Sequence, residues 1–519
     1  MRPEDIVAGK GRPFTGEEYL ESLKDGREVW IYGERVKDVT THPAFRNAAR
    51  SMARLYDALH APETKELLTG PTDGPNGGYT HRYFRVARSR EELAGQRAAI
   101  AGWARMSYGM MGRSPDYKAS LMNTLGANAA FYGKWADNAR AWYRRAQDAV
   151  LYMNHTLVNP PVDRSRPPET VKDVFIRITR ETDAGIYIIG AKVVATNSAL
   201  THYNFLGQNM SALANDESMA VMFIAPMDTP GIKLFCRPSY ELAAAAVGTP
   251  FDYPLSSRFD ENDAIFVFED VLIPWENVLV HRDVQKIAAF YPQSGFFNGL
   301  TFHGCTRFAV KLDFLVGLLA KALRANGSDD LRGVQAQLGE AIAWRNLFWA
   351  ITDSMVHNPQ PWVDGAVLPN PQSGHSYRVL APEAYAQIRQ IILKVVSSGL
   401  IYLPSGARDL RNPEADRVLA RYLRGSHGMD HRERIKLMKL LWDAVGTEFG
   451  GRQELYERNY AGNHEDIRIQ SMLNARAAGT LDAMMALADQ CMSEYDEEGW
   501  RTEGLFGPED VSVFGQGEG

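Results

Sequence analysis

The spacing of apolar residues changes twice along this chain of 519 residues, and those changes constrain its fold most. From residue 1 to about 150, apolar residues recur at the spacing of an α-helix. After about residue 285 the same spacing returns in segments long enough for a bundle. Five long helices are expected there, at residues 308–325, 334–356, 383–400, 431–456 and 473–495.

Short runs of β-branched and aromatic residues lie between the two helical regions and predict a sheet. Gly, Pro, Asp and Asn separate these runs, which cover residues 174–178, 185–189, 192–196, 222–225, 232–235 and 265–268. We therefore expect an α+β fold with three domains. They are an N-terminal helical domain at residues 1–151, a central small β-barrel or sheet domain at 152–284, and a C-terminal helical bundle at 285–519.

Composition excludes several classes of protein. With 57 Lys and Arg against 63 Asp and Glu, the net charge of −6 offers no basic field for nucleic acid. No window approaches the ~18 apolar residues of a membrane span, and no secretory signal opens the chain, so we expect a cytoplasmic protein without membrane contact. Cys236, Cys305 and Cys491 lie far apart, as expected of small buried apolar residues rather than metal ligands.

The usual nucleotide, protease and hydrolase motifs are missing. The chain has no G-x-G-x-x-G, P-loop, H-E-x-x-H or G-x-S-x-G motif, so a redox role would need electrons supplied from elsewhere. His427 and His431 have the spacing of a metal pair, but Gly425 and Gly428 favour a turn and no third ligand is apparent. We expect no metal site.

Three polar segments need an explanation. Ser114 and Pro115 predict the N-cap and first residue of a helix, with Arg113 just before it and Tyr117 in its first turn. A cation and a phenol would then face one cleft, which suits an anionic or polarised ligand. An ordinary cap with a solvated arginine explains the same spacing.

The second segment, residues 152–164, joins the helices to the sheet, and domain junctions often form ligand clefts. Its His155 has the chemistry of an acid, a base or a hydrogen-bond donor near neutral pH, although a core histidine is the simpler reading. The third segment, residues 194–203, is dense in hydroxyl and amide groups suited to a planar heterocycle or to a strand-ending turn.

Four stretches of the sequence resemble those of a known family. RPFTGEEYL (12–20), YGERVKDVT (32–40), DYPLSSRFDEND (252–263) and FGGR (449–452) closely resemble the oxygenase components of 4-hydroxyphenylacetate 3-monooxygenases. The resemblance runs from about residue 12 to about residue 500. It implies an acyl-CoA-dehydrogenase-like fold, in the same helix, sheet, helix order that the apolar spacing predicts.

The resemblance also implies an activity. Such enzymes receive diffusible FADH₂ from a separate NAD(P)H-dependent flavin reductase, form a C4a-hydroperoxyflavin with O₂, and hydroxylate a phenol ortho to its hydroxyl to give a catechol. The substrate would be 4-hydroxyphenylacetate-like, p-coumarate-like or tyrosine-derived, free or carrier-tethered, in a catabolic or a biosynthetic role. The family further implies a homotetramer.

The match assigns roles to residues of this chain. Arg113, Tyr117 and His155 would surround the phenol and the flavin ring, with His155 helping to deprotonate the substrate hydroxyl. Segments expected to line FAD are His155, Thr156, Leu157, Pro161, Val162, Asp163, Arg164, Thr196, Tyr460, Ala461, Gly462 and Asn463. Around residues 460–463, a simple turn at a helix end is the alternative reading.

Relatives vary at residues 204–215, where they fold a lid over the substrate tail. Gln208 and Asn209 are the expected ligands of a substrate carboxylate there, although the loop would equally admit a larger phenol. Other functions stay open on the same fold: an acyl-CoA dehydrogenase with tightly bound flavin, a radical hydroxyacyl-CoA dehydratase, which the scattered cysteines disfavour, and an inert binding protein.

Overall fold

The computed structural model describes residues 2–74, 77–208, 216–497 and 499–501. It separates the chain into two compact units, Met1–Arg458 and Asn459–Gly519, and each is described by itself. The three domains expected from the sequence, with limits at residues 151 and 284, stay a prediction.

Helices dominate the first 150 residues, as the apolar spacing predicted. They are α1 (Gly16–Ser22), α2 (Arg46–Asp57), α3 (Pro62–Leu68), α4 (Arg90–Met106), α5 (Ala119–Ala127) and α6 (Ala136–Ala149). On α2, the residues Ala49, Met52, Leu55 and Tyr56 are buried, which is the three- and four-residue spacing of one helix face. This region therefore folds around its own apolar stripes.

Two short hairpins within this helical region were not predicted. β1 (Glu28–Ile31) and β2 (Glu34–Val36) are joined by a two-residue turn in which Tyr32 and Gly33 have φ of 52° and 81°. That left-handed geometry matches the twist of a hairpin. The second hairpin is β3 (Thr69–Pro71) with β4 (Tyr79–His81).

Two sheets form the middle of the chain. The strands are β5 (Met153–Thr156), β6 (Arg177–Thr182), β7 (Gly185–Lys192), β8 (Tyr203–Leu206), β9 (Val221–Pro226), β10 (Ile232–Cys236), β11 (Ala264–Pro274) and β12 (Val278–His281). A six-stranded sheet has the order β2-β1-β10-β11-β7-β6, and a four-stranded sheet has the order β12-β9-β8-β5. Because β1 pairs in parallel with β10, the N-terminal hairpin extends the central sheet.

The strand predictions were partly correct. β7, β9, β10 and β11 confirm the runs at 185–189, 222–225, 232–235 and 265–268. The run at 174–178 was largely wrong, because a 3₁₀ turn (Lys172–Val174) delays β6 to Arg177. The run at 192–196 was also wrong, because β7 ends at Lys192 and Val194 takes φ of 58°. β5, β8 and β12 are four residues each and were missed.

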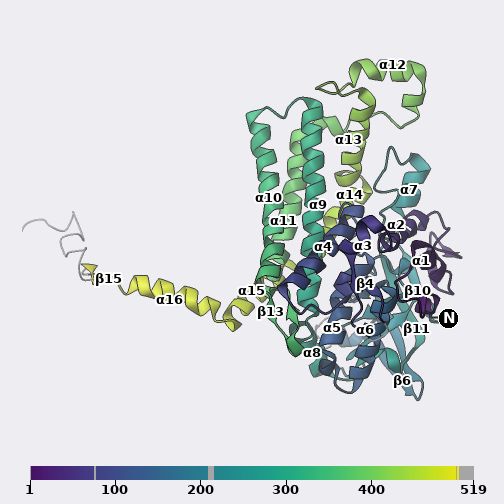
Figure 1. Ribbon diagram of the computed structural model, residues 1–519, viewed down its shortest axis with the longest axis vertical. Helices are drawn as coiled ribbons and strands as arrows, with labels where there is room; N and C mark the ends of the chain where they lie inside the picture. The colour runs from purple at the N-terminus through teal and green to yellow at the C-terminus, as the bar shows by residue number, and fades with distance from the viewer. Residues whose placement is uncertain (1, 75–76, 209–215, 498, 502–519) are drawn as a thin grey trace, which may run out of the picture. The chain divides into compact units, whose positions relative to one another are not determined.

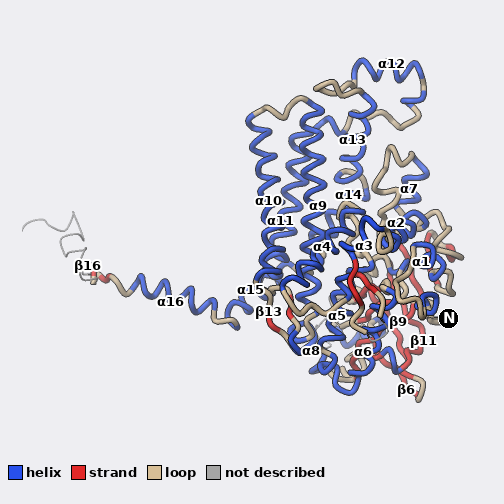
Figure 2. The backbone as a smooth tube through the Cα atoms, in the orientation of Figure 1, coloured by secondary structure: helices blue, strands red, loops and turns tan. Residues whose placement is uncertain are grey.

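Long helices follow the sheets. They are α8 (Val284–Gln293), α9 (Phe296–Asn326), α10 (Arg332–His357), α11 (Pro371–Val396), α12 (Pro413–Tyr422), α13 (His431–Val445) and α14 (Glu448–Asn459), with α7 (Tyr240–Val247) earlier and a small hairpin of β13 (Gln360–Pro361) and β14 (Val367–Leu368). α9, α10 and α11 pack along one another (Figure 1). Figure 2 shows the strands around β6, β9 and β11 gathered apart from these long helices. The single helix expected at 431–456 is interrupted after Val445.

The second unit contains α15 (His464–Ala477), α16 (Thr480–Met492), β15 (Tyr495–Asp496) and β16 (Gly499–Trp500). The single helix expected at 473–495 was wrong, because Gly479 has φ of 70° and ends one helix before the next begins. Cys491 on α16 is exposed, so the prediction of a buried residue was wrong there, whereas Cys305 is buried as expected. Among the described helices, none has the length and apolarity needed to cross a bilayer.

Candidate active site

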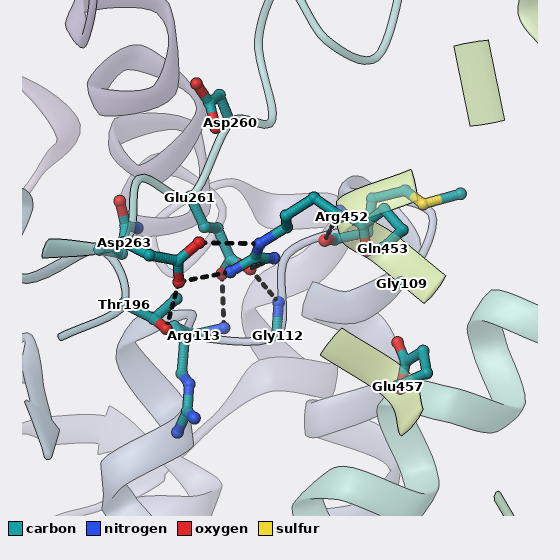
Figure 3. A network of polar contacts seen from close by, with 12 residues as sticks. Gly109, Gly112, Arg113, Thr196, Asp260, Glu261, Asp263, Arg452, Gln453 and Glu457 are labelled. Carbon is teal, nitrogen blue, oxygen red and sulfur yellow. Dashed lines mark hydrogen bonds and ion pairs between the residues drawn. The ribbon is translucent and has the colours of Figure 1, made fainter. Parts of the chain in front are cut away.

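A buried carboxylate fixes the backbone that carries Arg113. Glu261 accepts the backbone N–H of Gly112 at 3.0 Å and that of Arg113 at 2.5 Å. Arg452 on α14 lies 3.4 Å from the same carboxylate and donates to Asp263 at 3.0 and 3.1 Å. Figure 3 shows this network, with the Arg113 side chain directed away from it. The position of Arg113 thus depends on residues about 150 and 340 positions later in the chain.

The helix start predicted at Ser114 differs in detail. Residues Pro115–Lys118 form a 3₁₀ helix, and α5 begins only at Ala119. Ser114 does not cap it, because its hydroxyl donates to the Asp116 carboxylate at 2.5 Å. Asp116 is buried, and it also lies 3.3 Å from His303 Nε2. The Ser114 hydroxyl therefore hydrogen-bonds the buried Asp116 carboxylate instead of capping the helix.

Arg113, Tyr117 and His155 converge, as the sequence predicted. Arg113 Nη1 and the Tyr117 hydroxyl each lie 3.2 Å from His155 Nε2. The Arg113 guanidinium sits 4.1 Å from the centre of the Tyr117 ring. His155 comes from β5, so the sheet supplies the imidazole and the loop before α5 supplies the cation and the phenol.

A fourth residue of this cluster, Lys118, was not predicted. Its Nζ lies 2.7 Å from His155 Nδ1, and 4.4 and 4.3 Å from the ring centres of Tyr117 and Phe296. Lys118 has 0% of its surface exposed. The sequence carried no signal of this burial, because a lysine in a first helical turn is ordinarily solvated.

Burial and charge set the protonation of this cluster. Burial lowers the pKa of His155 well below its ordinary value, and the charges of Lys118 and Arg113 lower it further. Burial likewise lowers the pKa of Lys118 well below its ordinary value, with Arg113 adding to the effect. A neutral imidazole beside a fixed guanidinium is able to take a proton from a ligand hydroxyl and to stabilise the resulting anion.

Polar groups next to His155 fit a heterocyclic cofactor. The Thr156 hydroxyl and the Asn154 side-chain oxygen are buried, and neither has a hydrogen-bond partner within the described residues. The Asn154 side-chain nitrogen donates to the Thr196 carbonyl at 2.9 Å, and the Thr196 hydroxyl donates to Asp263 at 2.6 Å. Buried polar atoms need partners, so Thr156 and Asn154 suit the polar edge of a flavin.

The segment after β5 is exposed. Pro161, Val162, Asp163 and Arg164 all lie at the surface, and Asp163 takes φ of 39°. Across residues 2–74, 77–208, 216–497 and 499–501, no hydrogen bond or ion pair engages the Arg164 guanidinium. A solvated arginine without a carboxylate partner is suited to a phosphate group.

The side chain of Gln208 is engaged in a hydrogen bond within the protein. Its side-chain oxygen accepts from Lys192 Nζ at 2.9 Å, and Lys192 also donates to the Leu157 carbonyl at 3.1 Å. Burial lowers the pKa of Lys192 to about 7. Lys192 thereby links Gln208 to Leu157, one of the residues expected to line FAD. Asn209, the other expected carboxylate ligand, lies outside the described residues.

The predicted contacts at residues 460–463 belong to the second unit. Gly462 has φ of 106°, a backbone conformation that favours glycine. Asn463 caps α15, since its side-chain oxygen accepts the N–H of Glu465 at 3.0 Å. Tyr460 and Ala461 lie between Asn459, the last residue of α14, and this cap, so the segment is a turn that follows one helix and precedes the next.

The paired histidines considered for a metal each face one carboxylate. His427 lies 3.7 Å from Asp329, and His431 lies 2.7 Å from Asp416. Among the residues that the structure describes, no group of three or more His, Cys, Asp or Glu side chains is arranged to hold a metal ion.

Family models match nearly the whole chain. The model for the N-terminal part of 4-hydroxyphenylacetate 3-hydroxylase matches residues 15–280, and the model for its C-terminal part matches residues 287–489.

Individual proteins match over similar lengths. A 4-hydroxyphenylacetate 3-monooxygenase oxygenase component of Pseudomonas aeruginosa is 60% identical over 515 residues, covering 99% of each chain. A Streptomyces globisporus monooxygenase, named for a (3S)-3-amino-3-(3-chloro-4-hydroxyphenyl)propanoyl group on a peptidyl-carrier protein, is 57% identical, covering 97% of this chain and 95% of its own. A crystal structure of an oxygenase component of 4-hydroxyphenylacetate 3-monooxygenase with FAD and 4-hydroxyphenylacetate is 32% identical. It superposes with a TM-score of 0.85 over 92% of this chain and 99% of its own.

Proposed function

This chain belongs to the 4-hydroxyphenylacetate 3-hydroxylase family, and from that premise we propose that it is the oxygenase component of a two-component flavin-dependent monooxygenase. It would hydroxylate a phenol ortho to its hydroxyl and release a catechol. The single observation that carries this proposal is the convergence of Arg113 and Tyr117 on Nε2 of His155, at 3.2 Å each. The fold is α+β and acyl-CoA-dehydrogenase-like.

Reduced FAD, when bound, supplies together with O₂ the electrophilic oxygen that enters the ring. The residues that would hold FAD begin with His155, Thr156 and Leu157 on and after β5, and with Thr196. Thr156 contributes a buried hydroxyl that lacks a partner in the described chain. Arg164, with Pro161, Val162 and Asp163 before it, is our candidate for the pyrophosphate. Residues 460–463 stay predicted contacts.

The side chains of the cluster divide the work on the substrate. His155 accepts the phenol proton, because burial keeps its imidazole neutral and able to act as a base. Arg113 stabilises the negative charge that then develops on the phenol oxygen. Tyr117, whose hydroxyl lies 3.2 Å from His155 Nε2, orients the substrate ring.

A phenolate directs substitution to its ortho carbon, so holding the ionised substrate sets the position of hydroxylation. Arg113, Tyr117 and Lys118 are buried and His155 is half-buried, so the fold keeps most water away from the reacting groups. The chain itself thus contributes a base, a cation and a dry site.

The proposal requires partners. A separate NAD(P)H-dependent flavin reductase would supply FADH₂ in the cytoplasm, consistent with the words "oxygenase component" in the names of the relatives. The relatives' names include both a free phenol and a carrier-bound one, so we propose a phenolic substrate of either kind.

We also propose a homotetramer. In the second unit, α16 has no buried residue, and Met484, Leu487 and Met492 are 60%, 70% and 62% exposed. An apolar helix with this much exposure is suited to cover a second copy of the chain.

The function is tested by supplying the protein with enzymatically reduced FAD, O₂ and 4-hydroxyphenylacetate, p-coumarate or a tyrosine derivative. We expect a catechol from at least one of these phenols. Hydrogen peroxide alone from every phenol would overturn the proposal. A purified protein that carries tightly bound oxidised flavin would support the acyl-CoA dehydrogenase alternative.

A further inference from the structure

Lys118 is a buried amine that no carboxylate neutralises. Its exposed fraction is 0%, and in the described chain no Asp or Glu oxygen lies within 4.0 Å of Nζ. Its polar contact is His155 Nδ1 at 2.7 Å, and the rings of Tyr117 and Phe296 enclose it. A buried ammonium without a counter-ion is costly, so this arrangement favours the neutral amine.

The hydrogen bonds around His155 lead to the same protonation state. A guanidinium has only N–H donors, so the contact from Arg113 requires that His155 Nε2 present its lone pair. A neutral imidazole with a lone pair on Nε2 carries its hydrogen on Nδ1. That hydrogen points at Lys118 Nζ, and only a neutral amine has a lone pair to accept it. An ammonium there would place two donors against each other.

We propose that Lys118 is a positioning residue that, as a neutral amine, accepts the Nδ1 hydrogen of His155 and so keeps Nε2 unprotonated and able to take the proton of the substrate phenol. This inference rests on the proposed function. When the phenol proton moves to Nε2, the hydrogen on Nδ1 moves to Nζ. The imidazole ends neutral, the phenol becomes a phenolate, and Lys118 becomes an ammonium.

The surrounding charges suit that final state. Arg113 and Tyr117 face the cluster from the loop before α5, His155 faces it from β5, and Phe296 of α9 contributes an uncharged ring. The ring centre of His303, on α9, lies 5.5 Å from that of Tyr117, and His303 contacts Asp116. Only the imidazole of His155 would separate the new ammonium from the new phenolate, so the two opposite charges would lie close together. Burial and Arg113 lower the pKa of Lys118, as an amine that must start neutral requires.

The first test is made on the wild-type protein by ¹³C NMR of lysine labelled at Cε. Burial also lowers the pKa of Lys192, so we expect more than one lysine signal that titrates below the ordinary range, and we expect one of these signals to vanish in Lys118→Arg. In Lys286→Met it should persist. Lys286 is a matched control, because it also lies near an aromatic ring, 5.0 Å from Phe131, and donates to a backbone carbonyl. If no signal that titrates below the ordinary range is lost in Lys118→Arg, the proposal is overturned.

The second test uses 4-nitrophenol, whose phenolate absorbs visible light, bound to the protein in the presence of FAD. In Lys118→Met, we expect the bound probe to ionise at a pH higher by about one unit, which is a tenfold loss of phenolate. Lys118→Arg keeps a cation but has no lone pair, so it should not restore ionisation, whereas Lys286→Met should behave as wild type.

The outcomes separate the two proposals. Rescue by Lys118→Arg would show that only the charge matters and would overturn the role of the neutral amine. A wild-type protein that hydroxylates phenols, with an unchanged probe titration in Lys118→Met, would reject Lys118 and leave the proposed function intact. A wild-type protein that neither binds 4-nitrophenol nor forms catechols would reject the proposed function, while the NMR titration still reports the protonation of Lys118.

Discussion

The carboxylate of Glu261 lies 2.5 Å from the backbone nitrogen of Arg113 and holds in place the start of the segment that carries Arg113, Tyr117 and Lys118. Glu261 accepts the neighbouring amide of Gly112 as well, and it is 1% exposed. Arg452 on α14 balances its charge. Glu261 from the sheet region and Arg452 from the C-terminal helices therefore fix the backbone of Arg113 together. Arg113 is the cation proposed to stabilise the phenolate.

Replacing Glu261 with Gln should weaken both the fold and the site. The substitution leaves Arg452 with one buried carboxylate fewer and turns an amide donor toward two backbone N–H groups. We expect a loss of about 3 kcal/mol in the free energy of unfolding, typical of breaking a buried pair. The KM for 4-hydroxyphenylacetate should rise about tenfold, since one lost hydrogen bond to Arg113 is worth about 1.4 kcal/mol.

Urea unfolding and steady-state kinetics measure these two effects. Glu269→Gln is the matched control, because its side chain is 60% exposed and pairs with Lys233 at 2.6 Å. The control should change the free energy of unfolding by less than about 1 kcal/mol. Equal losses in the free energy of unfolding of the two variants would mean that the burial of Glu261 does not account for its contribution to stability.

Replacing His155 with Ala should uncouple the reaction without preventing flavin binding. The variant loses the base that ionises the phenol, so we expect catechol formation to fall by about 10²-fold. Affinity for reduced FAD should change little, because Thr156, Thr196 and Arg164 remain. The measurement is catechol and H₂O₂ formed per NADH with a flavin reductase present. Normal catechol yield in His155→Ala would show that another group takes the proton, and His42→Ala, far from the cluster in the sequence, serves as the control.

Replacing Gln208 with Leu tests whether this residue binds the substrate carboxylate or only supports the fold through Lys192. Its oxygen accepts from Lys192 at 2.9 Å, so the variant leaves this buried amine with one acceptor fewer. We expect a loss of about 1–2 kcal/mol in the free energy of unfolding. The KM values of 4-hydroxyphenylacetate and of 4-methylphenol, which lacks the carboxylate, should change by the same factor. A rise confined to 4-hydroxyphenylacetate would instead support Gln208 as a carboxylate ligand.

Local patterns were enough to predict the order of the architecture, whereas the trio of Arg113, Tyr117 and His155 was assigned by the family resemblance. Apolar spacing distinguishes a buried helix face from a strand over ten or more residues, which explains why α9 and α10 were foreseen. Four-residue strands such as β5 and β8 are too short for a period to emerge, and their pairing is with distant strands. The position of His155 came from the family resemblance, since a lone histidine carries no spacing signal.

The missing parts of the site depend on contacts between distant segments. Glu261 and Arg452 lie within strings that carried the resemblance, but no pattern indicated that they would meet the loop at Gly112. Lys118 follows Tyr117 directly, yet its burial depends on Phe296 of α9, almost 180 residues away. Such contacts follow from the packing of whole elements, which single-sequence spacing does not encode.

Acid should destabilise the protein partly through Glu457. Its burial acts to raise its pKa, but Arg307 at 2.5 Å and Lys311 at 2.6 Å outweigh burial and lower it from 4.5 to about 2. Because the folded pKa is the lower one, this carboxylate stabilises the fold fully above about pH 5, and the contribution, about 3 kcal/mol, is lost as pH falls toward 2. Glu457→Gln should therefore differ most from wild type near neutral pH and progressively less in acid, as measured by urea unfolding at several pH values. For Glu21→Gln, which removes a 63% exposed carboxylate, the difference should be small throughout. A Glu457→Gln difference that stays constant from neutral pH to about pH 3 would show that this carboxylate does not drive the acid sensitivity.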